Sequence, residues 1–217
     1  MAVHHMGVDT ERYRFRLRRR DPDAPVELLT VGRLIEKKGV AYALRAVAGL
    51  AEAGLPCRYR IVGDGPQRQD LERLRDELGL QDRVQFLGWR EQQSVIGLMQ
   101  DCDILLAPSV TAENGDQEGI PVTLMEAMAS GMLVASTWHS GIPELVEDGV
   151  SGRLVPERDA DPLTAALLRL CRDDAELWPG YSEAARGKIL EEFDITRLNR
   201  ALVARFRELA PDKAAAA

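Results

Sequence analysis

From Val26 onward the chain alternates between short runs of β-forming residues and longer helical patterns, and this alternation strongly constrains its fold. Strands that alternate with helices pair in parallel, because each helix carries the chain back to the start of the next strand. The pattern therefore predicts an α/β protein with a doubly wound parallel sheet of about six strands. The predicted strands are Val26–Gly32, Arg58–Gly63, Val84–Leu87, Asp103–Ala107, Met132–Ser136 and Gly152–Val155.

The helical patterns lie between these strands and continue beyond the last one. Apolar residues recur at helical spacing, and glycine or proline marks several helix ends. The predicted helices are Lys38–Gly54, Pro66–Leu78, Glu91–Gln100, the segment around Glu126, and three extra C-terminal helices, Asp161–Arg172, Asp174–Phe193 and Ile195–Leu209. We therefore expect one domain over residues 26–193, a leading linker over 1–25, a C-terminal helix over 194–210 and a disordered tail over 211–217.

The composition is typical of a globular protein that does not bind nucleic acid. The chain has 217 residues, 45% of them hydrophobic, and a net charge of -7, whereas nucleic-acid-binding proteins are usually basic. No stretch is long and apolar enough to span a bilayer, and the N-terminus has no apolar signal-peptide region. Cys57, Cys102 and Cys171 are too widely spaced for a metal cluster, so the sequence predicts reduced thiols, no metal site and a cytoplasmic location.

Six arginines lie between Arg12 and Arg20, interleaved with aromatic and aliphatic residues. Such a segment could contact nucleic acid or an acidic membrane. The acidic chain as a whole and the prolines at Pro22 and Pro25 favour a solvated connecting segment instead.

The segment from Glu118 to Gly131 places one glutamate before a helix and a second, Glu126, within it. Carboxylates suit sugar hydroxyls, and free backbone N–H groups at a helix start attract anions. The segment could therefore bind both ends of a sugar nucleotide. The alternative is an amphipathic helix with Glu126 on its solvated face. Apolar neighbours argue for burial, and a buried carboxylate needs donors, which a ligand diol would supply.

The first strand ends in a basic loop that contains Gly32, Arg33, Lys37 and Lys38. A guanidinium binds two phosphate oxygens at once, and an ammonium adds a mobile point charge. The pair Arg33 and Lys38 could therefore hold a diphosphate, with Gly32 allowing close approach to the backbone. The alternative is a polar loop whose cations are simply solvated.

Gly63 and Gly65 follow the second strand and resemble the start of a dinucleotide fingerprint. Arg68 stands where the third glycine would be required, which disfavours a nicotinamide-dependent oxidoreductase. We expect a tight turn beside the ligand cleft instead. Because this turn, the basic loop and residues 109–118 all follow strands, they should share the edge of the sheet where such folds bind ligands.

Several ordered motifs together resemble the C-terminal domain of family-4 retaining glycosyltransferases. These motifs are Val31–Gly39, Ile61–Pro66, Val84–Gly88, Pro108–Ser109, Glu118–Pro121, Glu126–Gly131 and Gly141–Gly149. The resemblance implies a GT-B enzyme with two Rossmann-like domains, of which this chain would be the one that binds the nucleotide-sugar donor. Almost nothing precedes Gly7, so we expect the N-terminal acceptor-binding domain to be missing from this chain.

The resemblance also implies roles for individual residues. Arg33 and Lys38 match the pair that binds the donor diphosphate, Glu118 the glutamate that contacts the transferred sugar, and Glu126 the one that holds the ribose. Catalysis would rest on Arg33, Lys38 and Glu118. The other residues expected to line the donor site are Gly32, Gly63, Gly65, Leu87, Gly119, Ile120, Pro121, Val122, Thr123 and Glu126. His139 follows the fifth strand and is expected either to line the sugar pocket or to be solvated.

The function expected from this resemblance is transfer of a hexose from a UDP- or GDP-sugar to an acceptor hydroxyl, without a cofactor or a metal. The chain alone should bind donor but transfer poorly, because catalysis requires both reactants to be positioned. A stand-alone binding module or the donor subunit of a split enzyme is the alternative. The apolar stripe of the last helix would cross to the missing domain, and its exposure favours a homodimer; peripheral attachment to the inner membrane face is a further expectation.

Overall fold

The computed structural model describes residues 4–172 and 174–209 and contains a six-stranded, all-parallel sheet in the order β3-β2-β1-β4-β5-β6. The strands are β1 Val26–Val31, β2 Cys57–Val62, β3 Val84–Gly88, β4 Ile104–Ala107, β5 Leu133–Thr137 and β6 Arg153–Val155. Each overlaps its predicted counterpart. The α/β class and the doubly wound, Rossmann-like architecture are thereby confirmed.

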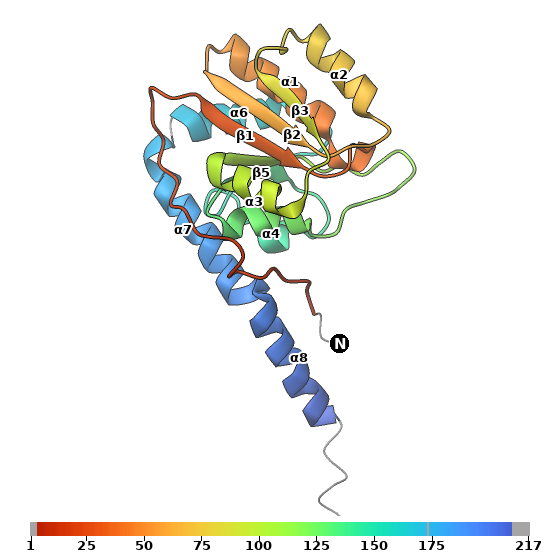
Figure 1. Ribbon diagram of the computed structural model, residues 1–217, viewed down its shortest axis with the longest axis vertical. Coiled ribbons are helices and arrows are strands. Elements are labelled where there is room, and N and C mark those ends of the chain that lie inside the picture. Colours follow the sequence, from red (N-terminus) through yellow and green to blue (C-terminus); the bar gives the residue numbers. More distant parts are fainter. Residues whose placement is uncertain (1–3, 173, 210–217) are drawn as a thin grey trace, which may run out of the picture.

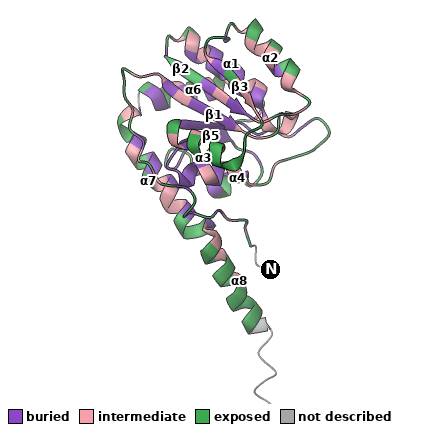
Figure 2. Cartoon of the chain, viewed as in Figure 1, coloured by how far each residue is buried: buried purple, intermediate pink, exposed green. Residues whose placement is uncertain are grey.

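Helices cover both faces of this sheet (Figure 1). On one face lie α1 (Val40–Glu52), α2 (Arg68–Glu77) and α6 (Ala160–Arg172). On the other face lie α3 (Gln92–Asp101), α4 (Val122–Ala129), α5 (Ile142–Leu145) and α7 (Trp178–Lys188). The central strands, such as β1 and β5, are therefore buried on both sides, as their purple colour in Figure 2 shows, whereas only Val84 is buried in the edge strand β3.

Short irregular helices complete the structure: 3-10 turns at Glu36–Lys38 and Ala175–Leu177, and a π-helix at Ile189–Phe193. The helix α5 was not among the predicted elements, because four residues are too few to show a helical period. The final helix, α8 (Ile195–Leu209), projects away from the body (Figure 1). The tail predicted for 211–217 and the end of the predicted helix at Ala210 lie outside the described residues.

Strand order reverses between β1 and β4, because the chain first builds β1, β2 and β3 outward and then returns to the other side of β1. The arrows of β1 and β2 in Figure 1 point toward the long loop that joins β4 to α4. A doubly wound sheet opens a crevice at such a reversal, just beyond the carboxyl ends of the strands.

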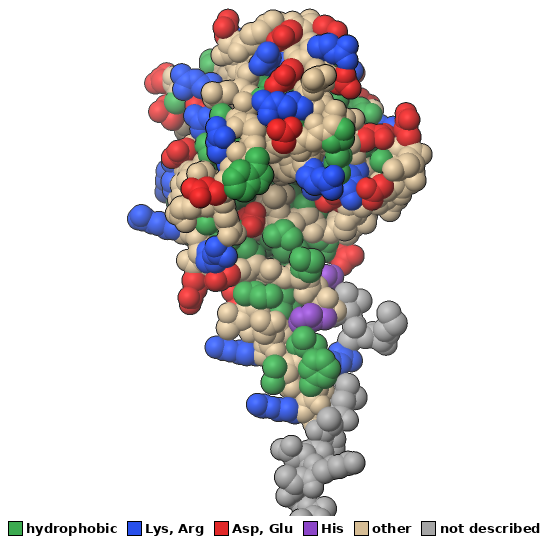
Figure 3. Space-filling view, turned by 45° about the vertical axis from the view of Figure 1, so that its right-hand side comes forward, with side chains coloured by type: hydrophobic (Ala, Val, Ile, Leu, Met, Phe, Trp, Pro, Cys, Tyr) green, Lys and Arg blue, Asp and Glu red, His purple; other side chains and the backbone are tan. Residues whose placement is uncertain are grey.

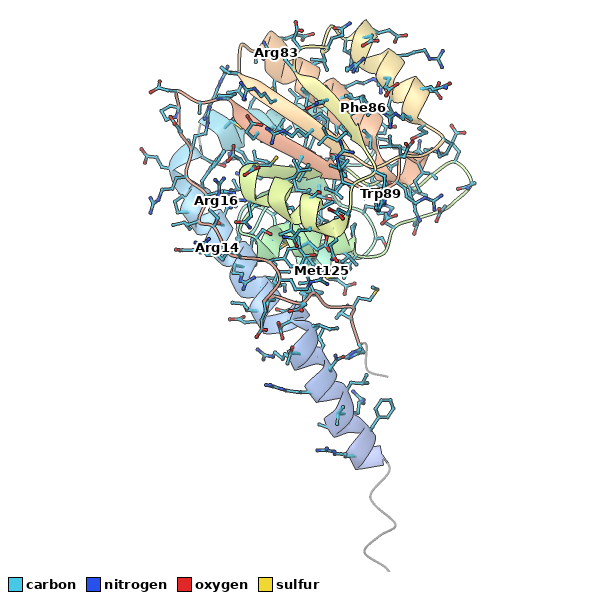
Figure 4. The ribbon with its side chains drawn as sticks, in the orientation of Figure 1. Arg14, Arg16, Arg83, Phe86, Trp89 and Met125 are labelled. Carbon is cyan, nitrogen blue, oxygen red and sulfur yellow. The ribbon has the colours of Figure 1, made fainter. Side chains whose placement is uncertain are left out.

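The leading segment differs from the expectation of a solvated linker. Tyr13 and Arg18 are 2% and 1% exposed. The Arg18 guanidinium donates to the carbonyl oxygens of Met99 at 2.5 Å, Cys102 at 3.0 Å and Ser130 at 3.3 Å. These carbonyls lie at the carboxyl ends of α3 and α4, where a cation is favoured by unpaired C=O groups. Arginines at neighbouring positions, such as Arg14, remain exposed on the surface (Figure 4).

Candidate functional site

The loops after β1 and β4 pack backbone against backbone at the strand reversal. A Cβ added to Gly39 would lie 1.8 Å from the carbonyl oxygen of Pro108, and Gly39 has φ +62°, so glycine is required there on both counts. The N–H of Val110 donates to the carbonyl of Lys37 at 3.0 Å. The basic loop after β1 is therefore held directly against the start of the loop that carries Glu118.

Lys38 and Glu118 meet across this junction, with Nζ 2.8 Å from Oε2, and Lys37 Nζ lies 3.3 Å from Oε1. Burial alone would raise the pKa of Glu118, but the hydrogen bonds and charges of Lys38 and Lys37 outweigh it, so the pKa is lowered. Glu118 is therefore ionised at neutral pH. Lys37 also contacts Asp116 at 3.0 Å, which draws it outward and leaves Lys38 as the more central cation.

Arg33 is exposed and lines the same small cavity as Lys38. The cavity also contains Gly32, Ser109 and, from the start of α4, Pro121 and Thr123. No side chain caps the N-terminus of α4. The structure thus brings both predicted cations, Gly32 and the helix start together at one edge of the sheet, and cations beside helix-terminal N–H groups are the kind of donors that bind phosphate.

The glycines after β2 have a packing role. A Cβ on Gly63 would lie 1.8 Å from the carbonyl oxygen of Gly32, and one on Gly65 would lie 2.5 Å from that of Leu34. The N–H of Leu34 donates to Asp64 at 2.9 Å. The turn after β2 is therefore pressed onto the basic loop after β1, which agrees with a tight turn beside the site.

Glu126 sits one helical turn beyond Val122 and Thr123, half-buried, and makes no contact with the cationic pair among the described residues. Its Oε1 accepts a 2.5 Å hydrogen bond from the hydroxyl of Tyr13. Burial raises the pKa of Glu126, and the Tyr13 hydrogen bond partly offsets that effect. The protein itself therefore supplies a donor that the sequence argument assigned to a ligand. Tyr13 was missed, because a hydroxyl 113 residues away leaves no local signal.

The remaining predicted positions surround the same edge. Leu87 is half-buried against the core, whereas Trp89, just beyond β3, is 74% exposed (Figure 4). Gly119 is exposed with open space where a Cβ would be, and Ile120 packs against Gly141. Leu87 and Trp89 thus lie at the end of β3, whereas Gly119 and Ile120 lie in the loop before α4.

His139 is neither a sugar-pocket residue nor a solvated one, because its side chain is only 1% exposed. Its Nε2 accepts a hydrogen bond from the backbone N–H of Glu118 at 3.0 Å, and its Nδ1 lies 2.6 Å from Oε1 of Glu157. Both expectations for this histidine were wrong. The packing of the long loop over β5 and β6 buries it, and sequence reasoning also missed Glu157.

The described part of the chain has neither a metal-binding cluster nor a membrane-spanning helix. Residues 4–172 and 174–209 contain no group of three His, Cys, Asp or Glu side chains placed to hold a metal ion. Within the same ranges, none of the helices combines the length and apolarity that a membrane crossing demands.

Comparison with known proteins places this geometry in context. A profile described as "Glycosyl transferases group 1" matches residues 25–173. The amylovoran biosynthesis glycosyltransferase AmsK of Erwinia amylovora is 43% identical over 195 residues, covering 88% of this chain and 47% of AmsK. The alpha-D-kanosaminyltransferase of Streptomyces kanamyceticus is 32% identical over 203 residues, covering 93% of this chain and 50% of that enzyme. The chain spans about half the length of the curated relatives it matches.

Solved structures agree on the fold. A crystal structure of Anabaena HepE in complex with UDP superposes with a TM-score of 0.78 at 24% identity, covering 93% of this chain and 56% of HepE. This chain therefore has the Rossmann-like fold found in GT-B glycosyltransferases. On the match of the profile to residues 25–173, the chain belongs to the group 1 family of glycosyltransferases.

Proposed function

We propose that this chain binds a nucleotide-diphosphate sugar and forms the donor half of a retaining hexosyltransferase. The observation that carries the proposal is the 2.8 Å contact between Lys38 and Glu118 at the strand reversal. This contact brings together the Lys38 ammonium, which is suited to binding phosphate, and the Glu118 carboxylate, which is suited to binding sugar hydroxyls. Arg33 and Lys38 lie close to the start of α4, which supports binding of a diphosphate at this edge of the sheet.

We propose for individual groups the roles that the family resemblance implies. Arg33 and Lys38 bind the diphosphate, Glu118 binds hydroxyls of the sugar, and Glu126 holds the ribose. The backbone of residues 119–123 meets the sugar and phosphate, with Leu87 and the Gly63–Gly65 turn on the side of the base. In the reaction, the bond between the anomeric carbon and the phosphate oxygen breaks, the acceptor oxygen bonds to that carbon, and its proton passes to a donor phosphate oxygen.

Fixed cations replace a metal in this proposal. The departing diphosphate gains negative charge as the bond breaks, and preorganised positive groups stabilise that charge in the transition state. The position of Arg33 and Lys38 beside the start of α4 supports this proposed role. UDP- or GDP-sugars are the proposed donors; the structures of Anabaena HepE with UDP and with UDP-glucose favour testing UDP first.

A second component is proposed to bind the acceptor. Because this chain covers about half of its relatives, the acceptor pocket is proposed to lie on another domain or polypeptide. We expect the chain by itself to bind donor and to transfer sugar poorly. A stand-alone binding module, or the donor subunit of a split enzyme, remains the alternative. Self-association through α8, a cytoplasmic location and peripheral membrane attachment of the whole enzyme are proposed with it.

Calorimetric titration of the purified chain with UDP, GDP, ADP, UDP-glucose, GDP-mannose and NAD tests the proposal. Binding of a UDP or GDP ligand in preference to NAD is the expected result. Binding of NAD alone would instead point to an oxidoreductase. Glycosyl transfer by the purified chain, measured as nucleotide release that depends on an acceptor, would contradict the assignment of a donor half and favour a complete enzyme.

A further inference from the structure

The buried side chain of His139 links two segments of the candidate site. Nδ1 lies 2.6 Å from the carboxylate of Glu157, and Nε2 lies 3.0 Å from the backbone nitrogen of Glu118. The hydrogen bonds from Thr111 and His139 outweigh the effect of burial and lower the pKa of Glu157, so it is ionised and can only accept. The proton of a neutral imidazole must therefore sit on Nδ1, which leaves Nε2 to accept from Glu118.

Glu157 binds the other end of the loop that runs from Thr111 to Glu118. Its second oxygen accepts a 2.7 Å hydrogen bond from the backbone N–H of Thr111. The guanidinium of Arg158 also donates to the carbonyl of Thr111. Both ends of the stretch from Thr111 to Glu118 are thus held by the pair of His139, which is buried, and Glu157, which is partly buried, although residues 113–117 between them are exposed.

Backbone strain flanks this pair. Ser140, next to His139, has φ 47°, and Arg158, next to Glu157, has φ 60°. Among residues 4–172 and 174–209 these two are the non-glycine residues with positive φ. Such conformations are unfavourable for residues with a side chain and persist where the surrounding structure holds them in place. Ser140 and Arg158 adopt these conformations directly beside His139 and Glu157. The surrounding structure therefore holds the His139–Glu157 pair in place although the neighbouring backbone is strained.

We propose that His139, oriented by Glu157, is a positioning residue that fixes Glu118 for the sugar of the donor. The inference rests on the proposed function and adds a residue to it. His139 is 1% exposed and cannot meet a ligand itself, so it acts through the backbone N–H of Glu118. His139 contacts the site through the backbone of Glu118, and it reaches the diphosphate end only indirectly, through the ion pair between Glu118 and Lys38. The pair should therefore affect binding of the sugar more than binding of the diphosphate.

Three variants separate this role from a general structural one. In His139→Leu, the backbone N–H of Glu118 loses the nitrogen that accepts its hydrogen bond. In His139→Gln, a side-chain oxygen near the position of Nε2 can still accept the N–H. His5→Leu is the control, since His5 is a partly exposed histidine beside Glu144 rather than the site. Calorimetry gives the affinity ratio of UDP-glucose to UDP, and of GDP-mannose to GDP, for each variant and the wild type.

His139→Leu should lower the sugar-to-nucleotide affinity ratio about tenfold while UDP or GDP affinity changes by less than about threefold. His139→Gln should restore much of the ratio, and the control should leave it unchanged. Equal losses of nucleotide and nucleotide-sugar affinity would show a merely structural role and overturn the proposal. So would an unchanged ratio in a folded His139→Leu chain.

A spectroscopic readout is independent of ligand. Nitrogen-15 NMR of the wild-type imidazole at pH 7.5 should show a protonated Nδ1 and an unprotonated Nε2, and the Glu118 amide should exchange faster in His139→Leu. A protonated Nε2 overturns the inference even if donor binding is normal. If the wild type shows the expected tautomer but binds no nucleotide or nucleotide sugar, the proposed function fails and the positioning role for the donor fails with it.

Discussion

The hydroxyl of Tyr13 donates a 2.5 Å hydrogen bond to Oε1 of Glu126, joining the N-terminal segment to α4 across 113 positions of the sequence. Gln92, at the start of α3, donates to the Tyr13 oxygen at 3.4 Å and itself accepts from Arg12 at 2.7 Å. The leading segment therefore packs against α3 and α4 beside Glu126. Its Tyr13 hydroxyl lowers the pKa of this carboxylate, which is proposed to hold the ribose.

Tyr13→Phe should destabilise the chain by about 1–3 kcal/mol, because a partly buried carboxylate loses a donor. The pKa of Glu126, already raised by burial, should rise further without the Tyr13 hydrogen bond. Urea unfolding at pH 7 measures the first effect. Tyr42→Phe is the matched control, since no described residue hydrogen-bonds the Tyr42 hydroxyl. Equal unfolding free energies of the two variants would show that the hydrogen bond between Tyr13 and Glu126 makes no net contribution to stability.

Arg33→Met and Lys38→Met should each weaken binding of UDP or GDP by about 10- to 100-fold, because each removes a charge-assisted hydrogen bond of about 1.5–3 kcal/mol. Isothermal titration calorimetry is the measurement. Lys188→Met, which removes a surface cation paired with Glu192 on another part of the chain, serves as the control. If both variants bind UDP and GDP as tightly as the wild type, the phosphates bind at another part of the chain.

Acidification should expose the contribution of Glu118 to stability. Its folded-state pKa is depressed below the ordinary 4.5, so its pairing with lysine stabilises the fold above about pH 4.5 and is lost as the pH falls through the lower, folded value. Glu118→Gln should therefore lose less stability than the wild type between pH 5 and pH 3, measured by thermal unfolding. The exposed Glu183→Gln should follow the wild type. Parallel curves for Glu118→Gln and wild type would refute the pairing.

Arg18→Met should cost at least about 3 kcal/mol, because several buried carbonyl groups at the ends of α3 and α4 lose a charged donor. Burial lowers the pKa of Arg18 to about 10, so the guanidinium remains charged at neutral pH. Chemical denaturation compares this variant with Arg14→Met, which removes an exposed arginine of the same segment (Figure 4). Equal small losses would mean that the buried arginine is not a helix-end cap.

Hydrophobic side chains gather over α8 and the adjoining part of the body (Figure 3). Val203 and Phe206 are 46% and 61% exposed. Val203→Glu with Phe206→Glu should leave the unfolding free energy within about 0.5 kcal/mol, since exposed positions contribute little. The double variant should also abolish concentration-dependent self-association in sedimentation velocity. Arg197→Glu, on another side of the helix, should not. A wild-type chain that stays monomeric at high concentration would contradict the proposed homodimer.

Local patterns in the sequence were sufficient for the six strands and the seven longer helices, and for the expectation that Arg33, Lys38 and Glu118 share one edge of a parallel sheet. The order of the strands came only from the tertiary structure. Periodicity and turn residues act over a few positions, and a parallel sheet then aligns the carboxyl ends of its strands. The proximity of Lys38 and Glu118 could therefore be inferred without coordinates.

Only the tertiary structure decided which buried polar groups form hydrogen bonds with one another. Tyr13 with Glu126, Arg18 with the helix-end carbonyls, and His139 with Glu157 are contacts between segments far apart in the chain. Their strength depends on burial and on distances of a few tenths of an ångström, which packing sets and local sequence does not record. For the same reason His139 read as a loop residue in the sequence and proved to be a buried anchor in the fold.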